Sequence, residues 1–290
     1  MQTTTISTTI TAFDAPARPM PRVRPRLCVL GSGSAGNCSV VELDSDPAGP
    51  RRAMLIDLGL SPKRTWSLLE RVGLCDRGAC EIEAIVLTHL DHDHAHAGWA
   101  SAIPAQTRVH LHKRHAGRAE RMGLLHRRCE LFEGAFEVGG LAARSVLMAH
   151  DELGVAVLRF DAESGGPTGT TSLGFATDLG RVSDAMIDLL TGVDVLAIES
   201  NYCPELQEAS ARPAFLKRRI MDGRGHLSNA ECVDAVHRIA PREHVVLLHL
   251  SRDCNRPELV AEHHAGADYS VTIASQDEPT RWVRVGPAAS

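Results

Sequence analysis

Four side chains that can bind metal ions stand close together directly after the apolar run Ala84 to Leu87. They are His89, Asp91, Asp93 and His94, an HxDxDH pattern. In an extended segment the side chains at i and i+2 point the same way, so His89 and Asp91 can face one metal ion. A turn at Asp93 and His94 would bring those two side chains to a second ion. The pattern favours a metal centre at the end of a buried strand over a solvated, charged loop.

Three further residues could complete such a centre. His150, Asp178 and His249 each follow an apolar run that we interpret as a strand, and loops at strand ends converge on one edge of a layered fold. Alone, each is better explained as the cap of a turn than as a metal ligand. Together they supply the bridging carboxylate and two imidazoles that a dinuclear site needs. His92 and His96 fall outside this spacing, and we interpret them as surface or supporting residues.

The elements that must position these residues alternate short aliphatic strands with turns. Strands are predicted at 26–30, 38–43, 53–57, 84–87, 108–112, 142–147, 154–160, 172–177, 193–198 and 244–248. Helices are predicted at 62–72, 113–122, 183–190 and 229–239. Ser228 and Glu231 form a capping box at the start of the last helix. Consecutive strands in the first half and helix-separated strands in the second predict a layered α/β sandwich.

Length and charge limit the classes of protein that fit. The 290 residues, 43% of them hydrophobic, predict one domain over residues 25–290 after a disordered leader at 1–24 that is rich in Thr, Pro and Arg. A net charge of -5 gives no global electrostatic case for nucleic acid. Any anionic substrate must therefore bind to a local patch of basic residues. The basic runs 113–121, 127–128 and 217–219 are candidates for phosphate contact, although exposed basic helices are common without one.

The eight cysteines are scattered without a CxxC pair. This spacing, with no secretory signal, predicts free thiols in a reducing cytoplasm rather than a disulfide framework. No window approaches the roughly 18 uncharged apolar residues that a membrane span requires, so we expect a soluble, cytoplasmic protein without membrane contact.

The glycine-rich segment 31–37 (GSGSAGN) follows the first predicted strand. Backbone N–H groups in such a turn can cradle a phosphate. The segment lacks the lysine of a P-loop and no clear helix follows it, so a tight turn at the rim of a site is an equal interpretation. Ser34 and Asn37 are the residues of this turn that we expect to contact substrate or to support the site.

The motifs together resemble a known superfamily. Asp57, the pattern at 89–94, His150, Asp178 and His249 resemble the five motifs of the metallo-β-lactamase fold hydrolases. The segments similar to the YycJ/WalJ group within that superfamily are 31–37, 149–151, 198–202, 225–229 (GHLSN) and 249–255 (HLSRDCN). That group is related to the tRNase Z and ribonuclease J nucleases, and its members are regarded as metal-dependent exonucleases acting on DNA. The resemblance implies a four-layer αββα sandwich, two divalent metal ions and nucleic acid, above all DNA, as substrate.

The resemblance also implies a role for each residue. One metal ion would be held by His89, Asp91 and His150, the other by Asp93, His94 and His249, and both by a bridging Asp178. Asp93 is thereby expected to be essential for catalysis. A hydroxide between the ions would attack phosphorus in line. His226, oriented by Glu199, would protonate the leaving oxygen, although a residue at the entry of a helix is the alternative interpretation of His226.

Two more residues are assigned from the same motifs. Asp57 is expected to hydrogen-bond the metal-binding loop without binding metal itself. Ser251, in the HLSxxxN segment, is expected to contact the substrate.

The sequence departs from the family pattern at one position. The usual motif is HxHxDH, and Asp91 stands where the second histidine is expected. A carboxylate hardens the first site, which should favour Mn or Fe over Zn. It also leaves open a weakened first site.

Two other functions remain open at this stage. A small-molecule hydrolase such as a lactonase or thioesterase would use the same fold. A non-catalytic module that binds nucleic acid would keep the fold with an impaired site. An oxidoreductase of flavodiiron type fits less well because the sequence has no flavin-binding domain.

Overall fold

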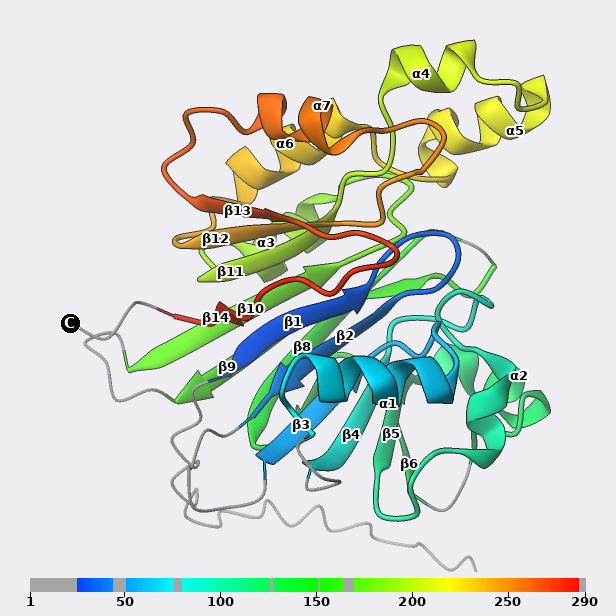
Figure 1. Ribbon diagram of the computed structural model, residues 1–290, viewed down its shortest axis with the longest axis vertical. Helices are drawn as coiled ribbons and strands as arrows, with labels where there is room; N and C mark the ends of the chain where they lie inside the picture. The colour runs from blue at the N-terminus through cyan, green and yellow to red at the C-terminus, as the bar shows by residue number, and fades with distance from the viewer. Residues whose placement is uncertain are drawn as a thin grey trace, which may run out of the picture.

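Two facing β-sheets form the centre of the structure, a computed structural model that describes residues 25–43, 51–75, 80–125, 128–150, 152–163 and 169–286 (Figure 1). The first sheet has the strand order β14-β1-β2-β3-β4-β5-β6, and the second has the order β13-β12-β11-β10-β9-β8-β7. Each sheet mixes parallel and antiparallel neighbours. The predicted leader, residues 1–24, lies outside the described residues.

The strands are short and several are parallel. Those of the first sheet are β1 (Arg26–Gly31), β2 (Cys38–Glu42), β3 (Arg51–Ile56), β4 (Cys80–Leu87), β5 (Arg108–His112), β6 (Cys129–Phe132) and β14 (Val283–Arg284). Those of the second are β7 (Ala135–Val138), β8 (Leu141–Met148), β9 (Val155–Glu163), β10 (Thr170–Ala176), β11 (Val195–Glu199), β12 (His244–Leu248) and β13 (Ser270–Ile273). Because β3 to β6 run parallel, as do β10 to β13, their carboxyl ends meet along one edge of each sheet.

The helices lie outside the sheets. They are α1 (Pro62–Arg71), η2 (Ala97–Ser101), η3 (Lys113–His115), α2 (Ala116–Arg121), α3 (Asp184–Leu190), α4 (Pro204–Ala209), α5 (Ala214–Arg219), η4 (Ile220–Arg224), α6 (Asn229–Ile239) and α7 (Pro257–His263). Ser61 caps α1, and Ser228 with Glu231 forms the predicted capping box of α6. None of the helices formed by the described residues is long and apolar enough to cross a membrane.

Side chains of the central strands are buried on both faces. In β1, Leu27 and Val29 join the apolar cluster between the two sheets, whereas Cys28 and Leu30 join the cluster beneath α1 and α2. A third cluster lies between the second sheet and the helices α3, α6 and α7. Strands covered on both faces consist of nearly continuous apolar residues, as these do. The four layers confirm the predicted αββα sandwich (Figure 1).

The predicted strands and helices are all present with small shifts at their ends, and the helix predicted over 113–122 is a 3-10 turn followed by α2. The sequence did not reveal β6, β7, β13, β14, α4, α5 or α7. These strands lie at or near the sheet edges and are largely exposed, so their apolar alternation is weak.

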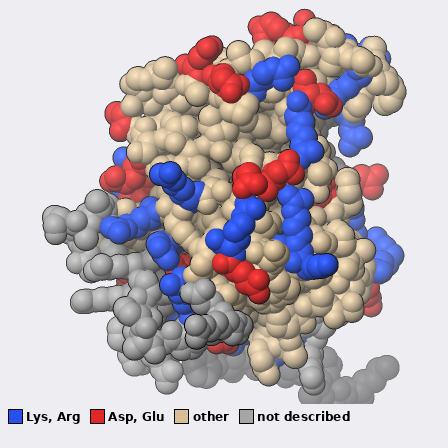
Figure 2. All heavy atoms as spheres, in the orientation of Figure 1, with Lys and Arg blue, Asp and Glu red and all other residues tan. Residues whose placement is uncertain are grey.

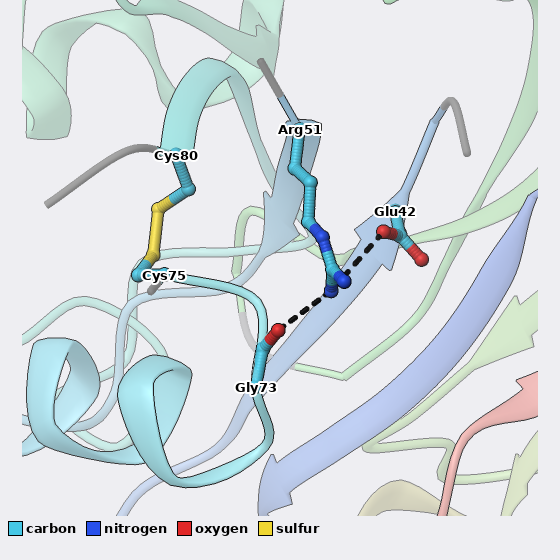
Figure 3. The surroundings of a disulfide bond; sticks show 5 residues. All are labelled: Glu42, Arg51, Gly73, Cys75 and Cys80. Atoms are coloured by element: carbon cyan, nitrogen blue, oxygen red, sulfur yellow. Dashed lines mark hydrogen bonds and ion pairs between the residues drawn. A yellow bond between two sulfur atoms is a disulfide. The ribbon is translucent and has the colours of Figure 1, made fainter. Parts of the chain in front are cut away.

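The prediction that all eight cysteines are free is wrong for one pair. Cys75 and Cys80 form a disulfide between the segment after α1 and the first residue of β4 (Figure 3). Their Cα atoms lie 4.8 Å apart, within the range that a disulfide spans. Nearby, Arg51 donates to the carbonyl of Gly73 at 2.6 Å. The fold brings these thiols together across residues 76–79, and no sequence motif marked the pair. Cys28, Cys38, Cys129, Cys203, Cys232 and Cys254 are free thiols.

Candidate metal centre

The carboxyl ends of parallel strands from both sheets carry the predicted site residues. In the first sheet, Asp57 follows β3 and His89 follows β4. In the second, Asp178 follows β10, Glu199 ends β11 and His249 follows β12. Apolar strand residues anchor each of these positions in the core, so the polar side chains are presented where the two sheets meet.

The first group of possible ligands combines the metal loop with the end of β8. Donor atoms of His89, Asp91 and His150 all lie within 4.8 Å of one another. The Oδ2 atom of Asp91 is 4.0 Å from Nε2 of His89 and 3.8 Å from Nε2 of His150. Asp91 therefore points into the group at the position where the family carries a histidine.

The second group joins the same loop to β12. Donor atoms of Asp93, His94 and His249 lie within 4.8 Å of one another. The Oδ2 atom of Asp93 is 3.9 Å from Nε2 of His94 and 3.7 Å from Nε2 of His249. The structure thus brings together the residues of the two triplets that the resemblance implied.

Asp178 lies between the two groups. Its Oδ2 atom is 3.6 Å from Nε2 of His89 and 2.5 Å from Nε2 of His94. Its Oδ1 atom is 2.7 Å from Nδ1 of His249. One carboxylate therefore contacts members of both triplets, which is the position that a bridging ligand requires.

The donor set fits divalent cations. Nε2 of His89 and Nε2 of His249 are buried without a hydrogen-bond partner, an arrangement that is costly unless another group satisfies them. Two ligands of a tetrahedral ion at about 2.1 Å lie about 3.4 Å apart. The separations of 3.6 and 3.7 Å between these nitrogens and the facing carboxylate oxygens are close to that value. Imidazoles and carboxylates of this kind suit Zn, Mn and Fe.

Asp57 orients a histidine of the second triplet. Its Oδ2 atom lies 2.7 Å from Nδ1 of His94, and its Oδ1 atom accepts a hydrogen bond from the backbone N–H of Thr88 at 2.8 Å. Because Nδ1 of His94 is engaged in this way, Nε2 is the nitrogen that faces the centre.

Backbone strain is concentrated at the same place. Among the described residues other than glycine, positive φ angles occur at Asp57 (63°), Asp178 (52°), His249 (56°) and Ala240 (52°). Ala240 ends α6 in the usual left-handed cap. The other three belong to the centre. Left-handed backbone costs residues with a Cβ of order 1 to 3 kcal/mol and persists where the surroundings impose it, most often at functional sites.

Protonated histidines balance the negative charge of the buried carboxylates in the centre. Burial alone would raise the pKa of Asp178, but the imidazoles of His249 and His94 outweigh it and hold that pKa well below its usual range. Burial would lower the pKa of His94, but the carboxylates of Asp178 and Asp57 outweigh it and raise the pKa to about 10. Burial and the neighbouring His94 lower the pKa of His89. The centre therefore attracts positive charge, and a cation that binds there must displace protons.

His226 and the buried Glu199 form a pair beside the triplets. Nδ1 of His226 lies 2.7 Å from Oε1 of Glu199. Oε2 of Glu199 accepts from the backbone N–H of Leu179 at 2.8 Å, which fixes the carboxylate. Burial would raise the pKa of Glu199, but the charge and hydrogen bond of His226 lower it. The side chain of His226 is 23% exposed.

The three residues predicted to contact substrate occupy different environments. Ser34 is exposed at the rim. Asn37 is buried, where it accepts from the N–H of Gly33 at 2.8 Å and lies 2.9 Å from Nε2 of His94. Ser251 is also buried, and its hydroxyl accepts from the N–H of Cys254 at 3.2 Å. Asn37 and Ser251 thus hold the local backbone, and Ser34 is the one that solvent reaches freely.

One residue of the centre was missed in the sequence. Arg118 of α2 lies 2.9 Å from Oδ1 of Asp91, opposite the oxygen that faces the first triplet. Residues 113–121 were a candidate phosphate-binding run, yet Lys113 pairs with Glu133 and Arg114 donates to a backbone carbonyl. An acidic residue in place of a histidine was the signal that could have pointed to a compensating cation.

Two sheets covered by helices, with imidazoles and carboxylates converging at the strand ends, define a metallo-hydrolase. Residues 31–183, more than half of the chain, match the family model of the metallo-beta-lactamase superfamily. The chain belongs to this superfamily, and it is a metal-dependent hydrolase.

Comparison with similar proteins shows which group of the superfamily this chain resembles. Exodeoxyribonuclease WalJ of Streptococcus pneumoniae serotype 2 (strain D39) is 26% identical over 279 residues, which cover 90% of this chain and 98% of WalJ. Exodeoxyribonuclease YycJ of Bacillus anthracis is 27% identical over 237 residues, which cover 80% of this chain and 84% of YycJ. The structure of the metallo-beta-lactamase fold protein YhfI from Bacillus subtilis matches with a TM-score of 0.63 and 16% identity, over 89% of this chain and 99% of that chain. The first two relatives confirm the resemblance to the YycJ/WalJ group.

Proposed function

We propose that the protein is a dinuclear metal-dependent phosphodiesterase that degrades DNA as an exonuclease, and that it acts in the cytoplasm. The observation that carries this proposal is the His226–Glu199 pair beside the two triplets. A sugar alkoxide is a poor leaving group and needs a proton, whereas hydrolysis of a good leaving group does not. The names of the WalJ and YycJ relatives support DNA as the substrate.

Each side chain has a defined task in this proposal. The two triplets would hold one cation each, and Asp178 would contact both. When bound, two divalent ions activate a water molecule and neutralise charge on the phosphate oxygens. Asp57 keeps Nε2 of His94 directed at the centre. Glu199 holds the Nδ1 proton of His226, so that Nε2 of His226 can deliver a proton to the leaving oxygen.

An activity assay tests the proposal directly. Purified protein supplied with Mn or Zn is expected to shorten end-labelled DNA from its ends, and His94→Ala, which removes a proposed ligand, should abolish this activity. A generic phosphodiester and a lactone serve as comparison substrates. Turnover of the lactone alone would make the protein a small-molecule hydrolase. DNA binding without bound metal or turnover would instead identify a binding module.

Asp91 should determine the metal preference. We propose that its carboxylate, oriented by Arg118, favours Mn or Fe. The double variant Asp91→His, Arg118→Leu is expected to raise the ratio of Zn to Mn affinity about tenfold. The second substitution removes the guanidinium that pairs with Asp91 in the unmodified protein. Metal titrations followed by thermal unfolding measure this ratio. Arg118→Leu alone is the control, and it should weaken binding of both metals without reversing their order. An unchanged ratio in the double variant would contradict the proposed role of Asp91.

A further inference from the structure

A polar cavity lies beside the segment that follows His249. It has a volume of about 610 Å³ and is lined by Ser210, Ala211, Arg212, Arg252, Asp253 and Arg256. The first three residues belong to the loop between α4 and α5, and the last three to the segment between β12 and α7. Figure 1 shows α4 and α5 projecting beyond the two sheets at the top of the molecule. The cavity therefore lies between the α4–α5 loop and the segment before α7.

Hydrogen bonds connect the cavity to the centre. A guanidinium nitrogen of Arg212 lies 3.3 Å from the hydroxyl of Ser251. The backbone N–H of Ser251 donates to the carbonyl of Asn201 at 2.8 Å, and the side chain of Asn201 donates to the carbonyl of His249 at 2.7 Å. Ser251 stands two residues after His249, so their Cα atoms lie at most about 7 Å apart. Arg212 is therefore connected by hydrogen bonds to the segment that carries His249.

One of the three positive charges of the cavity has no ion-pair partner among the described residues. Three arginines line it against one aspartate. Arg212 forms an ion pair with that aspartate, Asp253, with 3.2 Å between the guanidinium nitrogen and the carboxylate oxygen. Arg252 forms an ion pair with Asp277 at 2.6 Å. Arg256 is exposed and makes no ion pair with any residue that the structure describes; its side chain donates only to a backbone carbonyl at 3.5 Å. Arginine presents a planar fork of donors that matches phosphate.

Positive and negative charges around this cavity are more evenly balanced than those that line it. The adjacent cavity that contains Lys217 and Arg218 also contains Glu208 and Asp222. Figure 2 shows acidic and basic side chains interleaved over the displayed face. The three-arginine cavity therefore differs from these surroundings in having unbalanced positive charge.

We propose that this cavity binds a backbone phosphate of the DNA strand whose scissile bond lies in the metal centre. The inference rests on the proposed nuclease function and names the residues that hold the substrate away from the reacting atoms. Arg256 supplies the free guanidinium, and Arg212 links the bound phosphate to the segment that carries His249.

Arg256→Ala tests this binding role. The variant is expected to raise the KM for an oligodeoxynucleotide about tenfold with little change in kcat, because one charged hydrogen-bonding group is lost. The salt dependence of binding should become shallower by about one phosphate contact. Bis(p-nitrophenyl) phosphate lacks a neighbouring phosphate, so the selectivity for DNA over this substrate should fall by the same tenfold factor.

The control is Arg108→Ala, which removes the same charge at the amino end of β5, the far end of the strand from the centre. It should leave the selectivity unchanged. An unaltered KM in Arg256→Ala, or an equal rise in Arg108→Ala, would overturn the inference while leaving the nuclease function intact. Failure of the wild-type protein to cleave or bind the oligonucleotide would overturn the proposed function and the inference with it. Thermal unfolding midpoints verify that both variants fold.

Discussion

Asp178→Asn is expected to lose bound metal and to lower phosphodiester turnover by about a thousandfold or more, equivalent to about 4 kcal/mol. The substitution preserves size and removes the negative charge. Asp178 lies 3.6 Å from His89 of the first triplet and 2.5 Å from His94 of the second, so its carboxylate reaches both triplets. Its carboxylate also holds the pKa of His94 at about 10, and its loss removes the main attraction for positive charge at the centre.

Elemental analysis of metal per chain and kcat for bis(p-nitrophenyl) phosphate measure the two effects. Asp184→Asn provides a matched control, since that aspartate lies on α3 with its side chain 92% exposed and pairs with Arg238. We expect it to change neither quantity. Full metal content with full turnover in Asp178→Asn would show that this carboxylate does not bridge the ions.

His226→Ala should separate substrates by their leaving groups. For DNA, whose leaving group is a sugar alkoxide, kcat should fall by about 10² to 10⁴, the usual contribution of a general acid. For bis(p-nitrophenyl) phosphate the nitrophenolate leaves without a proton, and the loss should be far smaller. Glu199→Gln should show the same selectivity with a smaller loss, because the amide can still contact Nδ1 of His226.

Metal content decides between two roles for His226. Its ring nitrogen also lies with Asp178, Glu199 and His249 in a group with ligand-like spacing. A general acid leaves the metal content of the His226→Ala variant unchanged. Equal losses on both substrates, accompanied by loss of metal, would make His226 a ligand and contradict the proposed proton transfer.

The sequence predicted the buried parts of the fold well and its edges poorly. The apolar run 84–87 and the capping box before α6 are strong local signals, and both elements form where predicted. By contrast, β13 has a partly exposed pattern without alternation, and its position depends on pairing with β12. Local patterns cannot report an element whose stability comes from its neighbours.

The same distinction applies to the site. Residue types and strand ends were enough to predict a metal centre. The resemblance to the superfamily grouped His89 with His150 and Asp93 with His249, and the structure brings each pair together. The ion pair between Arg118 and Asp91 and the three-arginine cavity join segments that are separate in the chain, so no local pattern identifies both partners. The disulfide joins cysteines five residues apart, but no sequence motif marks that pair. Asn37 was predicted at a substrate-facing rim, but its environment depends on how the glycine-rich turn folds against the metal loop.

Each triplet takes residues from both halves of the sandwich. His89 and His94 come from the loop after β4, whereas His150 and His249 follow β8 and β12 of the opposite sheet. Cations held in this way would cross-link the two sheets, and the free energy of binding would add to the resistance of the core to opening. Chelation would then loosen the whole molecule, so metal supply in the cell would set the lifetime of the protein as well as its turnover.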